Sequence, residues 1–193
     1  MFPLNIKTIH ETFVGEFKSL NSKFIAYVFP FHQKEVLQGI LGQLKKEHPK
    51  ASHWCYAYRV GYQNEEFRAN DDGEPSGSAG KPILNQLYSH EVKNALIVVV
   101  RYFGGTKLGV PGLIEAYKEA ANDALKNANF VFEDEKFEMK YFVSMTKYYQ
   151  IMPFIKKHQI TILSESIIGN EINLTIKGNK EALDGLKMLI ESF

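Results

Sequence analysis

The pattern of apolar and polar positions predicts alternating strands and helices in the first two thirds of the chain. Residues 94–102 form the most apolar run, and its unbroken Val, Ile and Leu residues predict a strand that is buried on both faces. Apolar residues at helical spacing predict three helices, over residues 36–48, 79–89 and 110–127. Further strands are predicted over residues 6–14, 23–29, 53–59 and 65–70, with a connection at Gly15 and the polar residues 19–22. This segment is therefore expected to form an α/β or α+β sandwich.

After residue 130 the pattern starts again in the order β-α-β-β-α. Strands are predicted over residues 137–143, 159–164 and 170–177, and helices over 148–158 and 180–193. That order is typical of a ferredoxin-like half-sandwich with both helices on one face of the sheet. We therefore predict an α+β protein of two domains, residues 1–129 and 132–193, each with its own core.

Two glycine-rich loops, residues 71–82 and 101–112, lie on either side of the helix and strand at the centre of the first domain. Each loop runs into an apolar-periodic segment, so each is predicted to open a helix. Ser78 is the predicted N-cap of the first helix, and Pro82 and Pro111 fit the first turns. Two helix starts side by side would present free N–H groups and suit an anion.

The same loops carry a family resemblance. The segments DDGEPSGSAGKPIL (71–84) and VVVRYFGGTKLGVPGLIEAY (98–117) resemble the signature of the YigZ/IMPACT family, and FIAYVFPF (24–31) and HPKASHWCYAYRVG (48–61) match its N-terminal domain. The resemblance implies an N-terminal fold like the second domain of ribosomal protein S5. It also implies a C-terminal domain similar to the last domain of elongation factor G. Eukaryotic members of the family regulate translation by binding partner proteins, whereas its bacterial members have no settled activity.

Composition narrows the range of functions. The formal net charge of +1 over 193 residues gives no overall electrostatic signature for nucleic acid or membrane binding. A single cysteine, Cys55, excludes an internal disulfide and a multi-cysteine zinc site, and we predict a buried structural thiol. The histidines show no metal-ligand spacing, so neither a metal nor another cofactor is expected. Without a signal-peptide pattern or an apolar run of membrane-spanning length, the expected location is cytoplasmic.

Three carboxylates in the first loop, Asp71, Asp72 and Glu74, allow two interpretations. They could form a hard-cation site or an acid/base pair, but Asp-Asp-Gly and Glu-Pro-Ser-Gly are also strong turn sequences, and we favour the turn. The loop is not a phosphate-binding P-loop, because Pro75 stands where that pattern needs glycine and Pro82 where it needs Ser or Thr.

In the second loop, Arg101 is predicted either to pair with a loop carboxylate or to bind a ligand. Gly104 and Gly105 are expected to occupy backbone positions with positive φ. Tyr102 and Phe103 are expected to pack rather than to stack on a base.

We predict that the two loops form one functional surface for a ligand or partner. Its predicted members are Asp71, Asp72, Glu74, Ser76, Gly77, Ser78, Lys81, Arg101, Tyr102, Gly104, Gly105, Thr106, Lys107 and Gly109. The leading hypothesis is a non-enzymatic regulatory protein that acts on translation through a protein or RNA partner, with a small anion as a further candidate ligand. The competing hypothesis is an enzyme of unknown reaction, with an anionic substrate at the two helix starts and Asp71, Asp72 or Glu74 as acid, base or metal ligand.

RNA affinity in the second domain would require its lysines to gather on one face. The relevant residues are Lys140, Lys147, Lys156 and Lys157.

Overall fold

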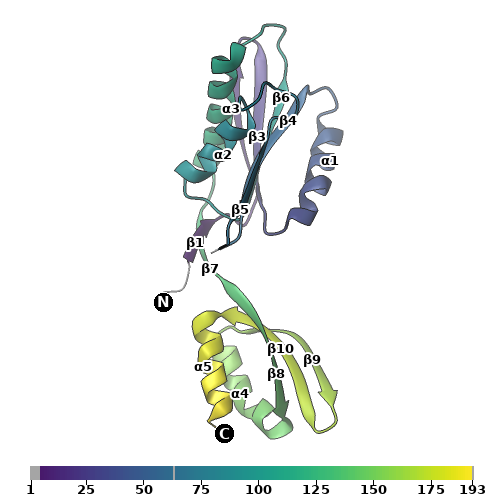
Figure 1. The fold of residues 1–193 in the computed structure, drawn as a ribbon, viewed down its shortest axis with the longest axis vertical. Helices are drawn as coiled ribbons and strands as arrows, with labels where there is room; N and C mark the ends of the chain where they lie inside the picture. Colours follow the sequence, from purple (N-terminus) through teal and green to yellow (C-terminus); the bar gives the residue numbers. More distant parts are fainter. Residues whose placement is uncertain (1–4, 63, 193) are drawn as a thin grey trace. The chain divides into compact units, whose positions relative to one another are not determined.

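The computed structural model describes residues 5–62 and 64–192 (Figure 1). The fold is mixed α/β and divides into two compact units, one of residues 6–133 and one that begins at Asp134. Predictions that fall on residues 1–4 and 193, the outer ends of the two predicted domains, lie outside the described residues.

The first unit is built on a five-stranded antiparallel sheet. Its strands, in spatial order, are β2 (Phe13–Ser19), β3 (Ser22–Pro30), β6 (Ala95–Tyr102), β4 (His53–Val60) and β5 (Glu66–Asn70). Helices α2 (Gly80–Ser89) and α3 (Gly109–Lys126) cover one face of the sheet. Helix α1 (Leu37–Glu47), which follows a short 3-10 turn at Lys34–Val36, covers the other (Figure 1).

Strand β6 lies at the centre of this sheet and explains the unbroken apolar run. Ile97 and Val99 pack into the core beneath α2 and α3, whereas Leu96 and Val98 pack into the core beneath α1. Residues 95–100 are fully buried, so the prediction of a strand buried on both faces is confirmed.

The predicted connection at residues 19–22 is present as a tight turn, whereas the connection predicted at Gly15 is wrong, because Gly15 lies within strand β2. The chain reverses at Leu20 and Asn21, both with positive φ, and Ser19 pairs with Ser22. Gly15 is required by packing: a Cβ there would lie 2.2 Å from the backbone nitrogen of Ala124 in α3. The predicted strand at 6–14 is also divided, into β1 (Asn5–Thr8), which pairs with β7 (Val131–Asp134), and the start of β2.

The second unit has the predicted order β-α-β-β-α. Its elements are β8 (Lys136–Ser144), α4 (Met145–Lys157), β9 (Thr161–Ile168), β10 (Glu171–Asn179) and α5 (Lys180–Glu191). The strands form an antiparallel sheet in the order β8-β10-β9. Residues such as Leu174 and Ile176 of β10 pack against Ile151 of α4 and Leu186 of α5, so both helices cover the same face.

The four lysines considered for RNA binding do not all lie on one face of the second unit. Met139, Tyr141 and Val143 of β8 point toward the helices, so Lys140, which alternates with them, points to the opposite face. The other three lysines lie on α4, and Lys147 donates to the carbonyl oxygen of Ile190.

Within the described part of the chain, no helix combines the length and apolar character that a membrane crossing requires.

Candidate functional site

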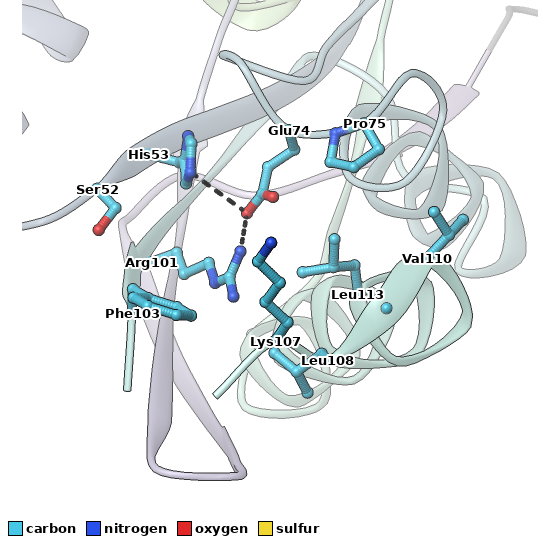
Figure 2. Close-up of a pocket in the computed structure, with 11 residues that line it drawn as sticks. Ser52, His53, Glu74, Pro75, Arg101, Phe103, Lys107, Leu108, Val110 and Leu113 are labelled. Atoms are coloured by element: carbon cyan, nitrogen blue, oxygen red, sulfur yellow. Dashed lines mark hydrogen bonds and ion pairs between the residues drawn. The ribbon is translucent and has the colours of Figure 1, made fainter. Parts of the chain in front are cut away.

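A cavity of about 480 Å³ lies between the two glycine-rich loops (Figure 2). The first loop contributes Glu74 and Pro75, and the second contributes Arg101, Phe103 and Lys107. The second loop also contributes Leu108, Gly109 and Val110 where it enters α3. The rest of the lining is Leu113 of α3 and, where β4 begins, Ser52 and His53. The fold thus brings both loops to one pocket.

The base of the pocket is a buried ion pair between Arg101 and Glu74. Arg101 Nη1 donates to Glu74 Oε1 over 2.5 Å, and the two side chains are only 6% and 4% exposed. Two phenylalanines lie near the guanidinium, whose Cζ is 5.4 Å from the ring centre of Phe24 and 5.5 Å from that of Phe103. Pairing with a loop carboxylate, one of the two roles predicted for Arg101, is therefore present.

Glu74 is also joined to α3 by a hydroxyl group. Tyr117 donates to Glu74 Oε1 over 2.7 Å. Cys55 Sγ lies 3.0 Å from the Asp71 carbonyl oxygen, which can only accept, and 3.3 Å from the Tyr117 hydroxyl oxygen. Burial raises the pKa of the Tyr117 hydroxyl and that of the Cys55 thiol, so both groups keep their protons and act as donors. Cys55 is fully buried, as predicted. This network connects β4, the first loop, β6 and α3 behind the pocket.

His53 has a defined orientation at the pocket wall. Its Nδ1 lies 2.8 Å from the carbonyl oxygen of Asp72, which can only accept, so Nδ1 carries the hydrogen. The other ring nitrogen, Nε2, faces Glu74 and lies 3.8 Å from its Oε1 (Figure 2). His53 was not among the predicted site residues, although its position two residues before Cys55 placed both side chains on one face of a strand.

Asp71 is the capping residue of α2, and the predicted role of Ser78 is wrong. The Asp71 carboxylate accepts hydrogen bonds from the backbone nitrogens of Gly77, Ala79 and Gly80 at 2.9, 3.0 and 2.8 Å. The Ser78 hydroxyl instead donates to the carbonyl oxygen of Pro75. Because Asp71 already occupies these N–H groups, the start of α2 does not offer them to an anion.

Asp72 also binds backbone rather than facing the pocket. Its Oδ2 accepts from the Trp54 backbone nitrogen over 2.7 Å. Asp71 and Asp72 therefore stabilise the turn, and Glu74 is the loop carboxylate that lines the pocket. The described residues contain no cluster of three or more His, Cys, Asp or Glu side chains that could hold a metal ion.

The remaining predicted site residues lie in several different places. Lys107 and Gly109 line the pocket with Glu74 and Arg101. Ser76, Gly105 and Thr106 are exposed residues that do not contribute to its lining, and the Tyr102 hydroxyl pairs with His48 on the α1 side of the sheet. Gly77 and Lys81 line a separate cavity of about 290 Å³ near Lys118.

The glycines of the second loop have different reasons for being glycine. Gly105 has φ of +86°, as predicted, whereas positive φ at Gly104 was predicted wrongly. A Cβ at Gly104 would lie 2.1 Å from the carbonyl carbon of Asn21, so the β2–β3 turn leaves no room for a side chain. Gly104 therefore places the second loop against that turn.

Comparison with known proteins identifies the family of this chain. Residues 20–125 match the model of the Impact N-terminal domain. An IMPACT family member from Haemophilus influenzae is 33% identical over 151 residues, which cover 77% of this chain and 73% of that protein. The IMPACT family member YvyE from Bacillus subtilis is 39% identical over 124 residues, or 64% of this chain, and the match spans only 57% of that protein's length. A crystal structure of an hypothetical protein has a TM-score of 0.77 at 25% identity, covering 96% of this chain and 90% of that one. The chain therefore belongs to the YigZ/IMPACT family.

Proposed function

We propose that this chain is a regulatory binding protein that acts on translation, and that it holds a translation-associated protein at the pocket between its glycine-rich loops. Membership of the family supports the translation link, because the resemblance implies that eukaryotic members regulate translation through partner proteins. Such a role would be carried out in the cytoplasm.

The observation that carries this proposal is the composition of the pocket rim. Phe103 is 48% exposed and Val110 is 46% exposed, beside the buried Arg101 and the exposed Lys107. Aromatic residues and arginine are enriched at the energetic centres of protein interfaces, where apolar contacts surround a few charged groups. A protein partner suits this rim better than RNA, because the described pocket offers only two cations, Arg101 and Lys107.

We also propose finer descriptions of the two units. The first would be an α/β sandwich like the second domain of ribosomal protein S5, and the second a ferredoxin-like domain similar to the last domain of elongation factor G. The antiparallel order β8-β10-β9 with two helices on one face supports the second assignment. We propose that the units are separate domains close to the predicted ranges 1–129 and 132–193. Expression of residues 1–133 alone should give a cooperatively folded protein.

One observation favours an enzyme as the second candidate. His53 Nε2 faces Glu74 at 3.8 Å across the pocket, with its other nitrogen fixed by the Asp72 carbonyl, so the ring could exchange a proton with an anionic substrate bound beside Arg101. In that case His53→Gln would abolish turnover while leaving capture of any partner unchanged. If the chain only binds a partner, no turnover that depends on His53 would be found.

Affinity capture from lysate tests the proposed function. The full chain, its Lys107→Glu variant and a Lys46→Glu control on α1, on the other face of the sheet, would each be used with and without nuclease. We expect the wild type and the control to recover the same translation-associated proteins in the presence of nuclease. Lys107→Glu should recover them at least tenfold less well, because the reversed charge lies inside the proposed interface. Equal recovery by Lys107→Glu would refute the proposal, and loss of all partners on nuclease treatment would indicate RNA instead.

A further inference from the structure

Two arginines, Arg59 and Arg101, are buried, and their guanidinium nitrogens differ greatly in how many hydrogen bonds they make. Arg59 uses Nε and Nη2 together to hold the Glu65 carboxylate at 2.8 and 2.9 Å. Its Nη1 donates to the carbonyl oxygens of Leu87 and Val92. Every nitrogen of this guanidinium therefore has a partner.

Arg101 is as buried as Arg59 but has one polar partner among the described residues. Only Nη1 is bonded, to Glu74, and the buried Nε has no hydrogen-bond partner. The Nε and Nη2 edge, which holds a carboxylate in Arg59, is therefore unused in Arg101. An unsatisfied buried donor costs stability, and a ligand with a planar acceptor would recover that cost.

The charges around the pocket indicate a singly charged ligand group. Arg101 and Lys107 carry two positive charges against the one negative charge of Glu74, and Lys107 extends into the pocket between Arg101 and Leu113 (Figure 2). The first turn of α3 opens at the pocket at Gly109 and Val110, and no side chain caps it. The pocket therefore has a surplus of one positive charge, whereas a phosphate dianion would bring two negative charges next to Glu74.

The rest of the lining is apolar. Leu108, Val110, Leu113 and Phe103 surround the space next to the arginine. The centre of the Phe103 ring lies 5.5 Å from the guanidinium Cζ and the side chain is half exposed, so the ring offers an apolar surface to an entering group. The anion should therefore be attached to an apolar group.

We propose that this pocket binds a carboxylate carried by an apolar group, held side-on by Nε and Nη2 of Arg101 and by Lys107. The inference rests on the pocket being the binding site of the proposed function. The carboxylate can belong to an acidic residue next to an apolar one in a partner polypeptide, or to a small organic acid.

Titration of the full-length ¹⁵N-labelled protein with phenylacetate tests this directly by NMR. We expect a Kd of about 1–10 mM, typical of a small fragment, and a shift of the Arg101 Nε–H signal, which is assigned by its loss in Arg101→Lys. Phenylacetamide, which is neutral, and phenyl phosphate, which is a dianion, should each bind at least fivefold more weakly. A short peptide with blocked ends and a central Phe-Glu pair, compared with its Phe-Gln analogue, shows whether a polypeptide carboxylate binds more tightly than the free acid.

Two variants locate the binding. Lys107→Ala should weaken phenylacetate binding about three- to fivefold, as expected for an exposed cation, and Lys46→Ala on α1 should leave it unchanged. Equal binding of phenylacetamide or phenyl phosphate, an unmoved Arg101 Nε–H signal at saturation, or an unchanged Kd in Lys107→Ala would each overturn the proposal. So would the absence of binding up to about 100 mM phenylacetate. Carboxylate binding without capture of a translation partner would refute only the proposed function, and partner capture without carboxylate binding would refute only this inference.

Discussion

Replacing Arg101 with methionine tests how strongly the buried ion pair holds the two glycine-rich loops together. Methionine keeps much of the apolar stem but leaves the Glu74 carboxylate buried without its guanidinium, beside the Tyr117 hydroxyl and, at 3.8 Å, His53 Nε2. Removing one partner of a buried pair costs about 3–5 kcal/mol. For a unit of residues 6–133, this corresponds to a drop in melting temperature of about 10–20 °C.

The double variant Arg101→Met with Glu74→Gln separates the coupling free energy of the ion pair from the other contacts of each side chain. Because that variant removes both charges, its cost should be smaller than the sum of the two single costs by about 2 kcal/mol. Urea unfolding followed by tryptophan fluorescence is the appropriate assay. Trp54 is the single tryptophan of the chain and lies in β4, so the signal reports on the first unit alone.

A matched control is available on the surface of the same unit. Lys34 and Glu66 also approach to 2.5 Å, but their side chains are 45% and 60% exposed. Solvent screens such a pair, so Lys34→Met should leave the unfolding midpoint unchanged. Purely additive single variants, or a Lys34→Met effect as large as that of Arg101→Met, would refute the reasoning.

Four further outcomes are expected. Asp71→Ala should lower the free energy of unfolding by about 2–3 kcal/mol in urea titrations, because three backbone N–H groups lose their acceptor. Lys107→Ala should leave the urea midpoint of the first unit within about 0.5 kcal/mol of wild type, as for an exposed charge away from structural contacts. Cys55 should react with a thiol reagent only as fast as the protein opens, because burial raises the pKa of its thiol; labelling at the rate of a free peptide cysteine would contradict this. Hydrogen bonds from Arg59 lower the pKa of Glu65 from 4.5 to about 2, so their stabilisation is present above pH 4.5 and is lost as the pH falls toward 2. The stability difference between wild type and Glu65→Gln should therefore shrink by about 1–2 kcal/mol over that range, allowing for solvent screening.

The parts of the fold that follow from local pattern could be predicted. The apolar run of β6 and the helical spacing of α2 and α3 are visible in the sequence because burial on both faces, or on one stripe, dictates residue type locally. Strand β2 could not be predicted in full because Gly15 is glycine for a reason that lies elsewhere in the chain. Its missing side chain makes room for the backbone of Ala124, a contact that only the folded sheet creates.

The candidate site shows the same division. The sequence indicated that Arg101 could pair with a loop carboxylate, but three carboxylates were available and only the folded loop selects Glu74. Capping by Asp71 was missed because its acceptor reaches forward to Gly80, whereas Ser78 stands at the expected local position. Tyr117 could have been found: a tyrosine on the buried face of a helix needs a partner for its hydroxyl, and a neighbouring carboxylate is a natural one.

Hydrogen–deuterium exchange of the chain with and without its captured partner tests the central claim most directly. If both loops form one binding site, the partner should slow exchange in residues 71–80 and in residues 103–113 together, and leave α1 unchanged. The phenylacetate complex should protect the same two segments to a smaller extent. Protection of one loop without the other, or protection confined to α1 or to the second unit, would contradict the account.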